Sequence, residues 1–240
     1  GEVKKEFDII PAMAMDVKKS ELKDLASADF VKKITIDHPV KAFRNNAVPL
    51  MRADLSMNTF GSNGTNIRIA IIDTGVFNHT EFQTPNRIVL QKCFTQNKCP
   101  SNNAATGDNA TDDNGHGTHV AGIAAGAGGS FGRGSAPNVT IMAIKVVDSS
   151  GNGADSDIIS GIQWAVDNGA NIISMSLGVT FDQFTDCYDV GSAVAVDNAT
   201  SRGVVVIVAA GNSGSSSRTI AAPACAKTVI AVGNTDKTHK

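Results

Sequence analysis

The chain has 240 residues, of which 42% are hydrophobic and 18% are charged, and its formal net charge is −2. This composition excludes fibrous and disordered proteins. A chain with neither an excess nor a run of Lys and Arg is not expected to bind nucleic acid. The longest apolar run, residues 204–210, is far shorter than the roughly 20 residues that cross a bilayer, so it predicts a buried strand and no membrane partner.

The first 43 residues differ from the rest because they are rich in lysine and poor in glycine. Strand-like or helix-like stretches lie at 7–10 and 20–25, and Ser20 is a candidate helix cap. The polar segment Arg44-Asn45-Asn46 lacks periodicity and predicts a linker. The sequence therefore divides into residues 1–43 and 44–240.

From residue 67 onward, short β-branched runs alternate with amphipathic segments, a pattern typical of βαβ units and a parallel sheet. Helices are predicted at 157–168, between the candidate cap Ser156 and Gly169, and at about 190–201. Strands are predicted at 67–72, 140–147, 171–176, 204–209 and 228–232. The fold class is α/β, and functional loops are expected beyond the carboxyl ends of the strands.

Four cysteines form a close pair, Cys93 and Cys99, and a distant pair, Cys187 and Cys225. Neither pair has the CxxC spacing of zinc or redox sites, so disulfides are favoured over four buried free thiols. Three pairings are possible, and pairing within each pair is preferred because 93–99 has the character of a small surface loop. Disulfides suit an oxidising compartment, which favours a secreted or extracytoplasmic protein.

The first chemical motif is Asp73-Thr74-Gly75, which follows an all-apolar strand. A carboxylate at this rim could accept a hydrogen bond from an imidazole N–H and stabilise the imidazolium. An aspartate that merely starts a turn is the alternative for this tripeptide alone.

The second motif, Asp113-Asn114-Gly115-His116-Gly117-Thr118-His119, places a histidine at the start of a helix. His116 is the candidate general base, since an imidazole exchanges protons near neutral pH. His119 is interpreted as a structural histidine, because a zinc site would need a third ligand nearby.

The third motif, Ala209-Ala210-Gly211-Asn212, follows the most apolar strand. The amide of Asn212 could donate to the negative oxygen of a tetrahedral intermediate. An ordinary turn is the alternative interpretation.

Together with Met175-Ser176-Leu177-Gly178, these motifs closely resemble those of the subtilase (subtilisin-like) serine proteases, from about Val48 to the end of the chain. The resemblance implies a three-layer parallel-sheet domain and a serine endopeptidase with the triad order Asp, His, Ser. Asp73 and His116 would belong to the triad, and Asn212 would be the oxyanion donor. No catalytic cofactor is implied.

The resemblance also implies a polypeptide substrate that lies as an added strand between two edges. The edges would be Gly151-Asn152-Gly153 and Ser176-Leu177-Gly178, and an apolar pocket for the residue before the scissile bond would be walled by Ala209, Ala210 and Gly211.

Residues 7–43 resemble the second half of the family's pro-region, an α+β inhibitor made as part of a zymogen, and cleavage is expected after Phe43. An unrelated N-terminal segment is the alternative. Calcium is a common structural ligand in the family, and Glu81 stands where an aspartate ligand often appears. The loop Ala127-Gly128-Gly129-Ser130 offers few side-chain oxygens, so the metal question stays open.

The family's nucleophile lies in a Gly-Thr-Ser-Met-Ala motif, which these 240 residues do not contain. The expectation is a partial chain that lacks a C-terminal segment and the first half of the pro-region, and that is inactive alone. A pseudoprotease that only binds polypeptides is the alternative function.

Overall fold

The computed structural model describes residues 1–37, 39–42, 53–96, 98–100, 103–128, 133–180 and 185–234, with the backbone alone for 39–42 and 53–56. Phe43 and the expected linker at residues 44–46 lie outside the described residues, so the boundary between 1–43 and 44–240 stays a prediction.

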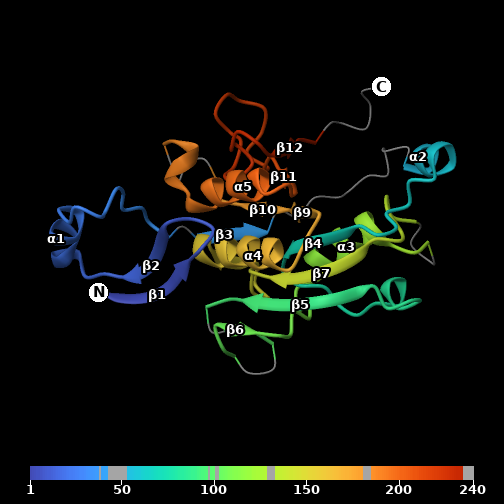
Figure 1. Cartoon of the computed structure of the whole chain (residues 1–240), viewed down its shortest axis with the longest axis horizontal. Helices are drawn as coiled ribbons and strands as arrows, with labels where there is room; N and C mark the ends of the chain where they lie inside the picture. The colour runs from blue at the N-terminus through green and yellow to red at the C-terminus, as the bar shows by residue number, and fades with distance from the viewer. Residues whose placement is uncertain are drawn as a thin grey trace.

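A central seven-stranded sheet has the order β12-β11-β9-β4-β7-β5-β6 and is parallel except for the β5–β6 pair (Figure 1). Its strands are β4 (Arg68–Asp73), β5 (Ile88–Phe94), β6 (Thr106–Gly107), β7 (Thr140–Lys145), β9 (Ile172–Met175), β11 (Val205–Ala209) and β12 (Ile230–Val232). The five strands predicted from the sequence are present, and β5 and β6 were missed. The predicted α/β class is confirmed.

Alternating residues of β4 show why the sheet is covered on two faces. Ala70 and Ile72 pack in one buried cluster, whereas Ile69 and Ile71 pack in a second cluster on the opposite face. Helices α4 (Asp155–Asp167) and α5 (Gly191–Ser201) bury apolar side chains in the first cluster, and α3 (His116–Ala125) does so in the second. The three-layer arrangement follows from this division.

Helix α4 begins earlier than the sequence suggested. Its N-cap residue is Ala154, and Ser156 lies inside the first turn. The prediction that Ser156 caps the helix is therefore wrong. Instead, the Ser156 N–H and hydroxyl donate to the carboxylate of Asp37, at 2.8 and 2.5 Å, so an aspartate from a distant segment satisfies this turn.

The N-terminal segment forms the antiparallel hairpin β1 (Glu2–Phe7) and β2 (Ala12–Asp16), followed by η1 (Lys19–Glu21) and α1 (Leu22–Ala26). In Figure 1 it lies to one side of the sheet, beside α4. The stretch 7–10 is mainly the turn of this hairpin rather than a strand, and Ile9 and Ile10 are buried in the cluster of α4 and α5. Ser20 lies within η1, whose N-cap residue is Lys18, so Ser20 is not a cap.

A small second sheet joins distant parts of the chain. The strand β3 (Pro39–Ala42) pairs antiparallel with both β8 (Asn152–Ala154) and β10 (Leu177–Gly178). The remaining short elements are α2 (Ala53–Phe60), η2 (Thr80–Phe82) and η4 (Cys187–Asp189).

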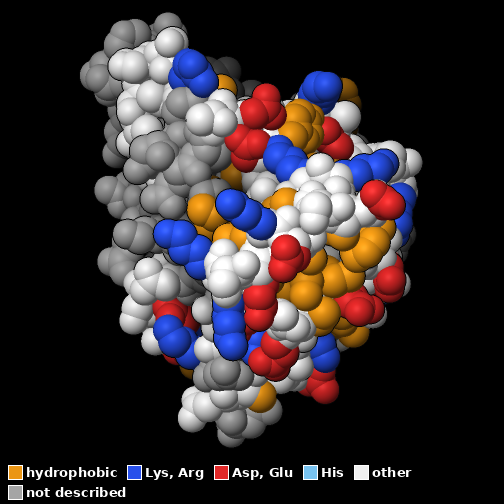
Figure 2. Space-filling model, turned by 90° about the vertical axis from the view of Figure 1, so that its left-hand side faces the viewer, with side chains coloured by type: hydrophobic (Ala, Val, Ile, Leu, Met, Phe, Trp, Pro, Cys, Tyr) orange, Lys and Arg blue, Asp and Glu red, His pale blue; other side chains and the backbone are white. Residues whose placement is uncertain are grey.

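Two disulfides, Cys93–Cys99 and Cys187–Cys225, form the pairs favoured from the sequence. No helix in the described ranges has the length and apolarity needed to cross a bilayer. On the face that carries the N-terminal segment, Figure 2 shows acidic and basic side chains interspersed rather than gathered by sign.

Candidate active site

The centre of the site is a contact between Asp73 and His116. Asp73 is the last residue of β4 and is fully buried, and His116 is the first residue of α3. The His116 Nδ1 atom lies 2.7 Å from Asp73 Oδ1, which also accepts a 2.7 Å hydrogen bond from the Thr74 N–H. The other oxygen, Oδ2, is buried and has no hydrogen-bond partner among the described residues. Two contacts on one oxygen therefore orient this carboxylate.

Each of the two motifs contains a glycine that the local geometry of this contact requires. A Cβ atom at Gly117 would lie 2.1 Å from the Gly75 carbonyl oxygen and 3.1 Å from the Cβ of Asp73. Gly75 has a φ of 103°, a conformation that other residues rarely adopt. Gly117 is thus required by the approach of the His116 helix to the Asp73 strand, and Gly75 by its backbone conformation and by the Ala110 carbonyl oxygen, which would lie 2.3 Å from a Cβ atom there.

Asp112 organises the turn that leads into His116, and the sequence analysis missed it. Its Oδ1 atom accepts hydrogen bonds from Thr74 Oγ1 and from the Asn114 and Gly115 N–H groups, and its Oδ2 atom accepts from Thr118. Burial opposes ionisation of this carboxyl, but the hydrogen bonds outweigh burial and lower its pKa. A side-chain acceptor just before a helix start was the available signal.

The other histidine of the motif, His119, lies one turn further along α3 and is exposed. Across the described part of the chain, no cluster of three or more His, Cys, Asp or Glu side chains could hold a metal ion. Glu81 uses Oε2 to accept a hydrogen bond from the Gly128 N–H, while Gly129 and Ser130 lie outside the described residues. The question of a calcium site therefore stays open, as the sequence left it.

The two expected substrate edges flank a strand of the chain itself. In β3, Lys41 lies opposite Asn152 of β8 and opposite Gly178 of β10, and Ala42 lies opposite Leu177. An extended segment from the first 43 residues thus fills the space between the edges that contain Gly151-Asn152-Gly153 and Ser176-Leu177-Gly178.

Asn212 lies in a bend after β11 and is exposed. Because β11, β9 and β4 are parallel neighbours, the segments after them, which begin at Ala210, Ser176 and Thr74, leave the sheet at one edge. Ala209, Ala210 and Gly211 are half-buried there, and the Ala210 N–H donates to the Val232 carbonyl oxygen. The sheet topology therefore collects the predicted groups at one rim, with Asp73 and His116 in direct contact.

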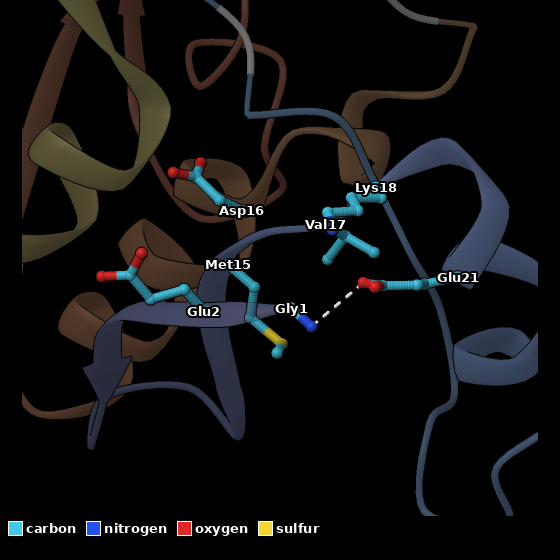
Figure 3. Close-up of a pocket in the computed structure, with 7 residues that line it drawn as sticks. All are labelled: Gly1, Glu2, Met15, Asp16, Val17, Lys18 and Glu21. Atoms are coloured by element: carbon cyan, nitrogen blue, oxygen red, sulfur yellow. Dashed lines mark hydrogen bonds and ion pairs between the residues drawn. The ribbon is translucent and has the colours of Figure 1, made fainter.

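A hollow of about 690 Å³ lies elsewhere, against the N-terminal hairpin. Figure 3 shows the residues around it, Gly1, Glu2, Met15, Asp16, Val17, Lys18 and Glu21. The Gly1 ammonium donates to Glu21 across it at 3.0 Å. None of the predicted chemical groups lines this hollow.

The chain is similar in sequence to known proteins of one family. The model of the subtilase family matches residues 64–240. Subtilisin DY from Bacillus licheniformis is 43% identical over 196 residues, which cover 79% of this chain and 63% of that protein. Alkaline elastase YaB from Bacillus sp. (strain YaB) is 34% identical, with 98% of this chain and 57% of that protein covered. Serine protease AprX from Bacillus subtilis (strain 168) is 33% identical, with 98% and 54% covered. The chain thus spans 54 to 63% of the length of these relatives.

Proposed function

The chain belongs to the subtilase family, and on this premise we propose that it is part of a serine endopeptidase whose Asp73 and His116 act with a serine nucleophile. The 2.7 Å contact between these two side chains, at the carboxyl end of a parallel strand, carries the proposal. The serine would come from a part of the full-length protein that these 240 residues do not include.

In this mechanism Nε2 of His116 takes the proton of the serine hydroxyl while the oxygen attacks the substrate carbonyl. Asp73 holds the ring by accepting from Nδ1–H and stabilises the imidazolium. The imidazolium then gives its proton to the leaving amine, which produces an acyl-enzyme. Water, deprotonated by the same imidazole, hydrolyses the ester and regenerates the serine.

Labelling of the full-length protein by a fluorophosphonate tests the proposal. The folded parent protein should be labelled, whereas His116→Ala and Asp73→Asn should lose labelling and self-processing by several orders of magnitude. The exposed His119, one turn along the same helix, supplies the matched control, and His119→Ala should keep both. A folded parent protein that resists labelling would contradict the proposal and favour a binding-only pseudoprotease.

Asn212 is proposed as the oxyanion donor because of its place after β11 at the common rim. Asn212→Ala should lower kcat by about 10²–10³, a magnitude established for this family rather than worked from this structure. KM should change much less, because the donor acts mainly in the transition state. An equal rise in KM with unchanged kcat would instead assign Asn212 to ground-state binding.

Residues 1–43 are proposed to be an inhibitory pro-region, cleaved after Phe43, and residues 44–240 part of the peptidase domain. The pairing of β3 with both substrate edges supports this, because a strand held there would exclude a substrate. Polar contacts also tie the segment to the rest of the chain, and three of them involve its charged side chains and serine or aspartate partners. Asp37 accepts from Ser156, Lys5 pairs with Asp157, and Lys33 lies 2.5 Å from Asp189.

Substitution of Asp37 tests the inhibitory role. Asp37→Ala removes the acceptor at the first turn of α4 and should weaken docking by about 1 kcal/mol, or roughly fivefold. Active enzyme should therefore appear sooner after refolding of the full-length protein. The matched control Asp29→Ala, at an exposed position, should leave the lag between refolding and the appearance of active enzyme unchanged. Equal lags for both variants would argue against docking through this contact.

The substrate is proposed to be a polypeptide with a medium or large apolar residue before the scissile bond. The apolar segment Ala209-Ala210-Gly211 supports this preference, as does the buried Ala221, whose N–H donates to the Ala210 carbonyl oxygen at 2.9 Å. A peptide series varied at that residue should give kcat/KM values that rise with apolar side-chain size, and faster cleavage after Lys or Asp would refute the assignment. The two disulfides support a secreted protein.

A further inference from the structure

Lys145, the last residue of β7, is fully buried although its side chain is charged. A buried ammonium is costly unless each of its three N–H groups finds an acceptor. Its Nζ atom has three: the Thr74 carbonyl at 2.8 Å, Asp113 Oδ1 at 2.6 Å and the Val147 carbonyl at 2.9 Å. The ammonium is thus fully hydrogen-bonded in one fixed position.

These three acceptors belong to three different segments of the site. Thr74 follows Asp73, Asp113 lies in the turn before His116, and Val147 lies in the loop between β7 and β8, which leads to the substrate edge. The charged partner Asp113 has 42% of its side chain exposed, so the ion pair reaches from the buried end of β7 to the protein surface.

Thr74 transmits this restraint to the reacting groups. Its N–H donates to Asp73 Oδ1, and its hydroxyl accepts a 2.8 Å hydrogen bond from the Gly117 N–H, next to His116. The second oxygen of Asp73 has no partner in the described structure, so the orientation of the carboxylate depends on Thr74 and His116. Movement of the Thr74 peptide would therefore rotate the carboxylate relative to the imidazole.

We propose that Lys145 is a positioning residue for the proposed proteolytic reaction, one that fixes the Asp73 loop against the turn before His116 through its contacts with Thr74 and Asp113. It touches neither substrate nor reacting atoms, and the inference rests on the proposed function. Since a misplacement of about 1 Å can cost about 100-fold in rate, its loss should appear in kcat rather than in substrate binding.

The test uses the full-length protein. A fluorophosphonate titrates the active sites, kcat is expressed per titrated site, and KM is measured in the same assays. Lys145→Met keeps the length of the side chain but removes all three donors, and kcat should fall about 10- to 100-fold while KM changes less than about threefold. Ile144→Val is the matched control, since Ile144 is the preceding buried residue of β7 and packs against the α4 side. It should lower the melting temperature and leave kcat per titrated site unchanged.

Asp113→Ala probes the same restraint from its exposed end, which covers the case in which Lys145→Met does not fold. Its kcat should fall by at least about threefold, a smaller effect than that of Lys145→Met because solvent screens the exposed end of the ion pair. An unchanged kcat per titrated site in Lys145→Met, or in Asp113→Ala where only that variant folds, overturns the positioning role. A folded parent protein that is never labelled refutes the proposed function and this inference with it, a result distinct from a labelled parent with unaffected variants.

Discussion

Asp155 should make the protein less stable as the pH rises through the weakly acidic range. It is the first residue of α4 and is 4% exposed. The pKa of its carboxyl is raised from 3.8 to about 6, chiefly by burial and with a contribution from the nearby charge of Asp37, although hydrogen bonds from Ser192 oppose the rise. The substitution Asp155→Asn replaces this carboxyl with a group that resembles its protonated form.

The magnitude follows from linkage between protonation and folding. Below about pH 3 the carboxyl is protonated in both states and costs nothing. Between pH 4 and 6 the unfolded chain ionises while the folded chain keeps its proton, so stability falls with rising pH until both states are ionised. A rise of about 2.2 pKa units at 1.36 kcal/mol each gives a cost of about 3 kcal/mol above pH 7. Asp155→Asn should therefore stabilise the protein by about that amount at pH 8, by much less at pH 4 and by almost nothing below about pH 3.

Urea unfolding of the full-length protein at several values between pH 4 and 8 measures this difference. The variants are made in a His116→Ala background, which should prevent self-digestion. Asp167→Asn is the matched control, because it lies on the same helix with 53% of its side chain exposed, and its effect should stay within about 0.5 kcal/mol. A difference between Asp155→Asn and its parent that does not grow with pH would refute the reasoning.

Two further contrasts can be measured by urea unfolding in that background. Lys5→Ala leaves the 1% exposed Asp157 without its cation and should cost about 3 kcal/mol, whereas Lys4→Ala removes only exposed pairs and should leave the stability nearly unchanged. Equal losses would contradict a special role for Lys5. Replacement of the disulfide Cys187–Cys225, which closes 38 residues, by alanines should cost about 4 kcal/mol, against about 2 kcal/mol for the 6-residue Cys93–Cys99 loop. The reverse order would show that native-state packing dominates over chain entropy.

The sequence allowed the parallel sheet and the pair Asp73 and His116 to be predicted because both signals are local. Each residue stands in a short motif at the end of an element, and its role depends on residue type and on that place. Strand β5 was missed although it contains Ile88, Val89 and Leu90, since only part of it is buried and its alternation is interrupted by an irregular register beside β7. The N-cap error at Ser156 has another cause, because its acceptor, Asp37, is 119 residues away.

Lys145 and Asp155 show why buried charges escape sequence reasoning. Both are almost completely enclosed, and neither stands in a recognisable motif. Lys145 meets three acceptors, two of them 71 and 32 residues away, so its charge is compensated and can hold segments together. Asp155 receives long hydrogen bonds of 3.2 and 3.4 Å from the Ser192 N–H, has no cation beside it among the described contacts, and is repelled by the like charge of Asp37. The same burial therefore makes one charge a restraint on the site and the other a cost to stability, and only the partners that the fold supplies decide between the two.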